Sequence, residues 1–183
     1  MNLRKLFIYL TLFISLVGNL FLGYKYKIEK DIISTEVCFT PDHKCTSLII
    51  DEIAKTKKEI LVQAYSFTSI AIAKALVRAK LDGVSVQVLL DRSNISSKYS
   101  CMKILQDNNI PVYIDSIKGI AHNKVMIFDS NRVLTGSFNF SKAADFKNVE
   151  NLLIINDKAL AKRYKKNWLA RQKIGYFHPK TGI

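Results

Sequence analysis

The sequence has few of the residues that build specialised frameworks: 3 cysteines, 3 prolines, 7 glycines and 1 tryptophan among 183 residues. Three cysteines are too few for a domain held together mainly by disulfides, and so little proline and glycine excludes collagen-like and low-complexity chains. Acidic residues are also scarce, with 15 against 28 basic residues and a net charge of +13. This surplus favours a polyanionic partner, either nucleic acid or an anionic lipid surface.

Charged residues are absent from residues 6–23, and basic residues flank this apolar stretch on both sides. A helix of this length, at about 1.5 Å per residue, reaches roughly 27 Å and can cross a hydrocarbon core. The layout also suits a secretory signal peptide, although Leu16 and Phe21 are too large for the −3 position of the available cleavage sites. A buried core helix is the remaining alternative. We expect residues 1–30 to be a signal peptide or membrane anchor, so that the protein is exported (secreted or periplasmic) or anchored through residues 6–23.

Apolar residues in the remaining chain alternate between the periods of strands and helices. Strands are expected at residues 36–39, 59–65, 84–90, 111–114, 124–128, 133–135 and 152–155, and helices at 46–57, 70–81, 100–108 and 158–173. This order predicts an α/β fold with a mixed, largely parallel sheet and helices on both faces. No linker rich in proline, glycine or serine interrupts it, so residues 31–183 are expected to form one domain.

Two similar tetrapeptides each end a predicted strand and lead into a helix: Tyr65-Ser66-Phe67-Thr68 and Gly136-Ser137-Phe138-Asn139. Sheets of this class bind ligands at the carboxyl ends of their strands. The repetition therefore predicts a shared functional edge, with chance similarity as the alternative.

The most informative pattern is H-x-K-x4-D-x6-G-S-x-N, formed by His122, Lys124, Asp129, Gly136, Ser137 and Asn139. His122 and Lys124 are two residues apart at a strand start, so their side chains point to one face. An imidazole, an ammonium, backbone donors, a hydroxyl and a carboxamide together suit a tetrahedral anion such as phosphate. Each residue taken alone also has an ordinary structural explanation, since Asp129 is typical of a hairpin turn.

These six positions resemble the motif of the phospholipase D superfamily, and residues 35–172 are similar to its short bacterial endonucleases. The resemblance implies a phospholipase D-like fold and a phosphodiesterase that works through a covalent phosphohistidine, with no metal or other cofactor. The roles that it implies are catalysis by His122, Lys124 and Asp129, with Asp129 supporting the site from behind, and phosphate binding by Lys124, Ser137 and Asn139. Supporting roles fall to Glu150, Ser66 and Gly136.

Members of this superfamily bring two such motifs to one site, but this sequence contains one. His178-Pro179-Lys180 imitates H-x-K, yet no Asp or Gly-Ser-x-Asn follows it. The resemblance therefore implies a homodimer with the active site at its two-fold interface. His122 of one subunit would attack phosphorus, and His122 of the other would protonate the leaving oxygen.

The motif specifies that a phosphodiester bond is broken but does not specify which two alcohols the phosphate joins. A sequence-nonspecific endonuclease is favoured by the resemblance and by eight basic residues after Asp157, which no acidic residue accompanies. A phospholipase D acting on phosphatidylcholine-type lipids is the alternative, supported by the N-terminal segment, although no apolar-rimmed loop that would receive acyl chains is evident. A binding protein on an inactive scaffold is a third possibility, and no motif residue is missing to favour it.

The cysteines bear on the compartment. Cys38 and Cys45 are seven residues apart, between a predicted strand and the next helix, where a disulfide is geometrically possible. In an exported domain they would form that bond, and in a reducing cytosol they would be packing residues. Cys101 has no partner in either case.

Overall fold

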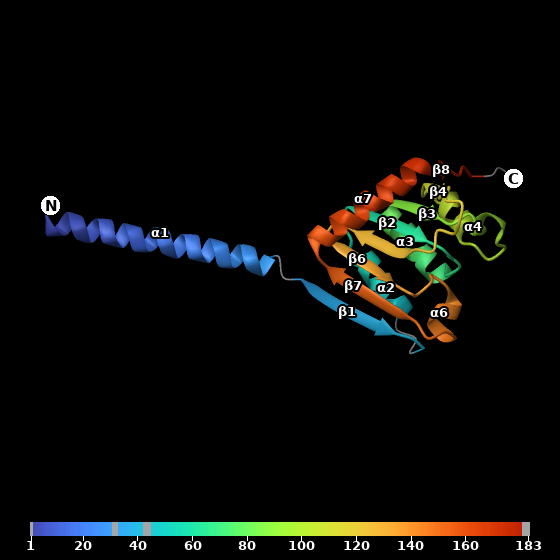
Figure 1. The fold of residues 1–183 in the computed structure, drawn as a ribbon, viewed down its shortest axis with the longest axis horizontal. Helices are drawn as coiled ribbons and strands as arrows, with labels where there is room; N and C mark the ends of the chain where they lie inside the picture. The colour runs from blue at the N-terminus through green and yellow to red at the C-terminus, as the bar shows by residue number, and fades with distance from the viewer. Residues whose placement is uncertain (1, 31–32, 42–44, 181–183) are drawn as a thin grey trace. The chain divides into compact units, whose positions relative to one another are not determined.

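The computed structural model describes residues 2–30, 33–41 and 45–180 (Figure 1). Two compact units make up the chain, Met1–Ile33 and Ser34–Ile183. The first is helix α1, Leu3–Lys30, whose segment Leu3–Tyr24 has a mean hydropathy of 2.1. Among the described helices it alone is long and apolar enough to cross a membrane, a test that an N-terminal signal sequence also passes.

The second unit is built around an eight-stranded sheet with the order β1-β7-β6-β5-β2-β3-β4-β8. The strands that the structure describes are β1 Ser34–Phe39, β2 Glu59–Ala64, β3 Ser85–Leu90, β4 Val112–Ile114, β5 Lys124–Phe128, β6 Arg132–Gly136, β7 Asn151–Asn156 and β8 Tyr176–Phe177. The most buried strands, β2 and β5, lie next to each other in the middle of the sheet. The core thus fixes β2, which leads into the tetrapeptide that starts at Tyr65, and β5, which starts at Lys124 of the motif.

The α/β class is confirmed, but the expectation of a largely parallel sheet was wrong. Only β2–β3 and β3–β4 pair in parallel, and the other five neighbouring pairs are antiparallel. The parallel pairs are those joined through helices, as crossover connections require. No helix lies between β4 and β5 in the described chain, and a tight turn joins β5 to β6, which produces antiparallel pairing; β6 and β7 also pair antiparallel, although residues 137–150 with a short helix lie between them.

Helices cover both faces of the sheet, as predicted. On one face lie α2 Cys45–Lys55, α3 Ile70–Leu81 and α5 Met102–Asp107, which share a core cluster with the side chains of Ile60 and Val62. On the other face α7, Lys158–Ile174, packs Trp168 against Leu61, and the indole Nε1 donates to the Val62 carbonyl at 2.9 Å. Because adjacent residues of β2 point to opposite faces, this one strand anchors both helical layers.

Two short helices, α4 Ser93–Ser96 and α6 Lys142–Phe146, follow strands β3 and β6. The helix expected after Gly136–Asn139 is α6, whereas α4 and the two-residue strand β8 were not predicted. Ser69 begins α3 and Ser141 begins α6 in the same way, since each serine Oγ accepts a bond from the backbone N–H three residues later. These caps fix the points at which α3 and α6 begin.

Candidate active site

The motif residues gather at one edge of the sheet because β5 runs antiparallel to β2. The register pairs Lys124, the first residue of β5, with Ala64, the last residue of β2. The end of β6 and the start of β7 lie at the same edge, with Gly136 opposite Leu152. Two strand starts and two strand ends are thus brought together by pairing that the sequence pattern alone does not reveal.

His122 and Lys124 both contact the ring of Tyr65. The rings of His122 and Tyr65 meet edge-on with centroids 4.6 Å apart, and the Lys124 ammonium lies 5.1 Å from the Tyr65 ring centroid. The Tyr65 backbone N–H is in turn held by the Asn123 carbonyl at 2.7 Å. His122 is exposed, whereas Lys124 is only 6% exposed. An accessible imidazole therefore stands next to an ammonium that is largely withdrawn from water.

The ammonium of Lys124 has little compensation for its burial. Its Nζ donates to the His122 carbonyl at 3.1 Å. Burial lowers the pKa of Lys124 below its ordinary value, and the negative charge of Glu150 acts in the opposite direction. A buried cation with one neutral acceptor has donors left for an anionic ligand.

Ser137 and Glu150 form a tight pair beside this lysine. The Ser137 hydroxyl donates to Glu150 Oε2 at 2.5 Å and accepts from the Asn151 backbone N–H at 3.0 Å. Glycine is required at position 136, because its φ is +148° and a Cβ there would lie 2.3 Å from the Asn151 carbonyl oxygen. Gly136 thereby lets the end of β6 approach β7 closely, so that the Ser137 hydroxyl reaches the Glu150 carboxylate.

The carboxamide of Asn139 has unused hydrogen-bonding capacity. Its Oδ1 is buried and has no partner among the described residues. An unpaired polar atom of this kind is costly unless a ligand or another chain satisfies it. Asn139 is therefore a candidate contact for something that the isolated chain does not contain.

The two similar tetrapeptides do lie at one edge, as predicted. Phe67 pairs in parallel with Phe140, and their rings pack edge-on with centroids 5.8 Å apart. The backbone N–H groups of Thr68 and Ser69 both donate to the Phe140 carbonyl. Ser66 lies within this paired segment and is half-buried. The pairing joins Phe67 to Phe140 rather than to Phe138, so the two sequences are neighbours without superposing residue for residue.

Two supporting residues were missed from the sequence. Buried Asp91 follows β3 directly, and its Oδ2 accepts from the backbone N–H of Ala121, next to His122, at 2.7 Å. Burial alone would raise the pKa of Asp91, but its backbone donors outweigh that effect and lower it. Asn94 donates to the Tyr65 carbonyl at 2.6 Å and accepts from the Phe67 N–H. An aspartate immediately after a buried strand was the available signal for this pair.

Asp129 lies at the opposite edge of the sheet from the other motif residues. Its carboxylate accepts three backbone bonds, from Lys57 at 3.0 Å, Lys58 at 2.7 Å and Glu59 at 3.0 Å. Five residues of β-strand separate it from Lys124, a distance of roughly 16 Å. With φ at +51° it begins the β5–β6 turn. Its position supports a part in holding β5 to the start of β2.

Part of the basic charge of α7 also lies away from the site. Lys165 is paired with Glu59, at the start of β2, whereas Arg171 is paired with Asp115, which follows β4 at the same edge of the sheet as the site. The exposed cations Lys162 and Arg163 precede Lys165 and therefore belong to the half of α7 near the Asp129 edge. Close to His122, by contrast, the loop after β4 exposes Ile120 at 61%, an apolar feature that sequence analysis did not anticipate.

Comparison with known proteins agrees with this arrangement. The family described as "Cardiolipin synthase, PLD-like domain" matches residues 49–171. A protein of Rickettsia prowazekii named phospholipase D is 42% identical over 156 residues, which cover 85% of this chain and 76% of that protein. Both matched regions contain the full motif.

Two solved structures are similar over nearly their whole length. Nuc from Salmonella typhimurium, described as a phospholipase D family member, has a TM-score of 0.78 and 37% identity, covering 81% of this chain and 99% of Nuc. NucT from Helicobacter pylori has a TM-score of 0.76 and 25% identity, covering 80% of this chain and 100% of NucT. Both likenesses span the length of the sheet-containing unit.

Proposed function

This chain belongs to the phospholipase D superfamily and is a phosphodiester hydrolase, and we propose that it is a sequence-nonspecific endonuclease with a phosphohistidine intermediate. The observation that carries the proposal is the exposed His122 beside the buried, under-compensated Lys124 at one sheet edge. A nucleophile must be open to its substrate, and a buried cation stabilises anionic charge most strongly where water is excluded.

In the proposed mechanism a neutral nitrogen of the His122 ring attacks phosphorus and forms a P–N bond. The leaving oxygen takes a proton from the imidazolium of His122 of the partner subunit as the P–O bond breaks. That second imidazole then accepts a proton from water, whose oxygen attacks phosphorus and breaks the P–N bond. Both histidines return to their starting states, and no metal or other cofactor takes part.

Non-bridging oxygens of the phosphoryl group would be held by the cation and amide of the site. We assign Lys124 as the main charge and Asn139 as a neutral partner, because each has hydrogen-bonding capacity left over. Ser137 and Ser66 flank the same edge as weaker phosphate contacts. Glu150 orients Ser137 through their 2.5 Å bond.

Asp129 and Gly136 have supporting roles in this scheme. Asp129 fastens the far end of β5, and Gly136 allows the close approach of β6 to β7. Neither needs to touch substrate. Both act by holding the strands whose ends carry His122, Lys124 and Ser137.

A second copy of this chain completes the proposed site. One motif supplies one histidine, whereas the mechanism uses two in different protonation states. A two-fold axis through the site edge would place the two His122 side chains on opposite sides of one phosphoryl group. The buried, unpartnered Oδ1 of Asn139 at this edge is consistent with a surface that is incomplete in the single chain.

Phospholipid is the second candidate substrate, and two observations favour it. The Rickettsia relatives are named phospholipase D. Ile117 and Ile120 are also exposed in the loop that leads to His122, where they would meet acyl chains at a bilayer surface. We further propose that residues 1–30 act as a signal peptide or membrane anchor, which would place the domain of residues 31–183 outside the cytosol or beside a membrane.

One experiment separates these substrates. The full-length protein in mild detergent and excess chelator is offered single-stranded DNA, duplex DNA, RNA and phosphatidylcholine vesicles, with His122→Ala as the control. Chelator-resistant, His122-dependent cleavage of nucleic acid supports the endonuclease. Choline release without cleavage of nucleic acid replaces it with phospholipase D. Activity that survives His122→Ala, or that needs a metal, contradicts the mechanism.

A further inference from the structure

Few side chains of the edge strand β1 are buried against the rest of the domain. Cys38 is the one side chain of its six residues that is buried. Its backbone pairs with β7 along the whole strand, from Ser34 opposite Asn156 to Phe39 opposite Asn151. Cys38 is also bonded by a disulfide to Cys45, the first residue of α2. With so little apolar contact, this covalent bond is a major part of what fixes the end of β1.

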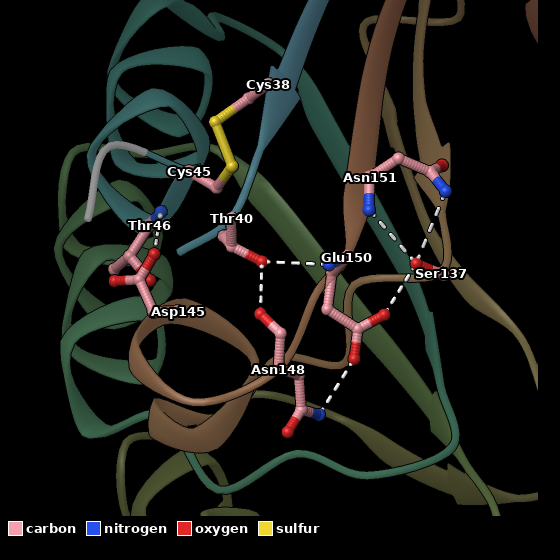
Figure 2. Close-up of a disulfide and its surroundings, with 9 residues drawn as sticks. All are labelled: Cys38, Thr40, Cys45, Thr46, Ser137, Asp145, Asn148, Glu150 and Asn151. Carbon is pink, nitrogen blue, oxygen red and sulfur yellow. Dashed lines mark hydrogen bonds between the residues drawn. A yellow bond between two sulfur atoms is a disulfide. The ribbon is translucent and has the colours of Figure 1, made fainter. Parts of the chain in front are cut away.

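Thr40, one residue beyond β1, is hydrogen-bonded to the segment that leads into β7. Its backbone N–H donates to the Glu150 carbonyl at 3.1 Å, and its Oγ1 donates to the Asn148 carbonyl at 2.9 Å. The same Oγ1 accepts from the Glu150 N–H at 3.0 Å. Thr40 is only 6% exposed, so water does not readily replace these bonds. Figure 2 shows the hydroxyl between the two residues, two positions along the chain from Cys38.

The segment that Thr40 holds includes Glu150, whose carboxylate belongs to the site. Glu150 Oε2 accepts from Ser137, and Oε1 accepts from Asn148 Nδ2 at 2.9 Å (Figure 2). The charge of Glu150 also acts on Lys124. A rotation or shift of the Glu150 backbone would therefore move Ser137 and change the charge around Lys124.

We infer that Thr40 is a positioning residue for the active site and that the Cys38–Cys45 disulfide keeps it in place. The inference rests on the proposed phosphodiesterase site and adds a chain of support from the disulfide through Thr40 to Glu150 and Ser137. Neither cysteine nor Thr40 touches substrate in this arrangement. Their effect is on the turnover of a correctly folded enzyme.

A second contact strengthens the link between α2 and the site. The backbone N–H of Thr46, beside Cys45, donates to Asp145 Oδ1 at 3.3 Å, and Asp145 is buried in α6 (Figure 2). The first turn of α2 is thus bonded to β1 through the disulfide and to α6, the helix that precedes the segment ending at Glu150, through Asp145. This gives the disulfide a rigid element to which β1 is tied.

The inference is tested by removing only the hydroxyl of Thr40. Thr40→Val keeps the shape of the side chain, and Thr40→Ser keeps the hydroxyl. On bis(4-nitrophenyl) phosphate, Thr40→Val is expected to lower kcat about tenfold with little change in KM, and Thr40→Ser to remain within about twofold of wild type, as for loss of a modest positioning interaction. Equal rates for Thr40→Val and wild type, or equal losses in both variants, would overturn it.

The disulfide is tested by reduction. A dithiol reagent supplies two electrons and two protons, converts Cys38–Cys45 to two thiols and is itself oxidised to a disulfide. Wild type is expected to lose kcat on reduction to a similar extent, whereas Cys38→Ala/Cys45→Ala should start low and not respond. Cys101→Ala is the matched control and should respond as wild type does, because Cys101 is buried and its pKa is raised to about 11. Wild-type kcat that is unaffected by reduction contradicts the role of the disulfide.

The support can also be measured without activity. Thr40→Val removes the acceptor of the Glu150 N–H, so hydrogen exchange at that amide should accelerate, while Thr40→Ser should not change it. Unchanged exchange in Thr40→Val overturns the inference even if no substrate is turned over. Absence of His122-dependent hydrolysis in wild type, by contrast, would count against the proposed function alone.

Discussion

The charged groups at the two ends of β5 differ in how fully their hydrogen-bonding capacity is used. At the Asp129 end the carboxylate is satisfied by three backbone donors, all between 2.7 and 3.0 Å. At the Lys124 end the ammonium has a single neutral acceptor, His122 is exposed, and the nearby Asn139 Oδ1 is buried without a partner in the described chain. The Asp129 carboxylate is fully satisfied within the chain, although Oδ1 of Asn131 in the same turn is buried without a partner among the described residues, whereas the Lys124 ammonium keeps donors in reserve.

This difference separates the motif into a chemical part and a structural part. Folding alone explains Asp129, because a charged acceptor facing three N–H groups stabilises a turn. It does not explain a buried lysine with so few partners, which costs free energy in the absence of a ligand. A charged group that is satisfied at one end and a charged group with spare donors at the other are what a binding site mounted on a rigid strand requires.

The largest effect is expected at the chemical end. His122→Ala should lower kcat by at least about 10³-fold, since it removes the nucleophile and, in a dimer, the acid as well. Because the side chain is exposed, the free energy of unfolding should change by less than about 0.5 kcal/mol. Rates on an artificial phosphodiester and urea unfolding measure the two quantities. Residual activity above a few per cent would contradict the phosphohistidine scheme.

A smaller effect is expected from the charge beside Lys124. If the Lys124 ammonium binds the phosphoryl group, the rate falls as pH rises through its pKa. Burial lowers that pKa and the Glu150 carboxylate opposes the lowering, so Glu150→Gln should lower it further and move the alkaline limb of the pH–rate profile to lower pH. A limb that stays in place or moves to higher pH would refute this pairing. Ser137→Ala, which leaves the carboxylate charge, is the matched control.

Local structure was largely predictable from the sequence, but strand pairing was not. The bounds expected for the helix at 70–81 and the strand at 124–128 are those of α3 and β5. Apolar residues at helical spacing define the first, and a continuous apolar run that ends at a turn defines the second. The antiparallel pairing of β2 with β5 joins segments about 60 residues apart, and no local pattern encodes it. The parallel expectation failed for this reason, and α4 and β8 were missed because each is too short to have a period.

The site shows the same division. Spacing and residue type were enough to select His122, Lys124 and Asn139, whose chemistry is carried by their side chains. Asp91 and Thr40 act through backbone groups 30 and 110 residues away, so their importance depends on the fold. Asp129 was found by the motif, but its distance from the other residues became evident from the strand register.

At the structural end, stability rather than turnover should respond. Asp129→Asn weakens three charge-assisted bonds and should lower the free energy of unfolding at pH 7 by about 1–3 kcal/mol, with kcat of the folded enzyme unchanged. Burial alone would raise the pKa of Asp129, but its backbone donors together lower it. The stabilisation is therefore present above the unfolded pKa of about 3.9 and is lost as pH falls through the lower folded value. Urea unfolding at pH 7 and pH 3 should show the difference between variant and wild type shrinking in acid; a large loss of kcat would instead give Asp129 a catalytic part.

The smallest effect is expected from the basic residues of α7, if the Lys124 end alone receives substrate. Lys162 and Arg163 lie in the half of α7 next to the Asp129 edge, where Lys165 pairs with Glu59. Reversing both charges with Lys162→Glu/Arg163→Glu should change kcat/KM on nucleic acid by less than about threefold at physiological salt, because screening acts over about 8 Å. The matched control is Lys142→Glu/Lys147→Glu, on exposed positions in and just after α6, close to Asn139. It should reduce kcat/KM several-fold and flatten its salt dependence, since phosphate contacts release counterions. A stronger loss from the α7 pair would mean that a long polyanion crosses the face of the sheet as well as its edge, and would make the two ends of β5 parts of one binding surface.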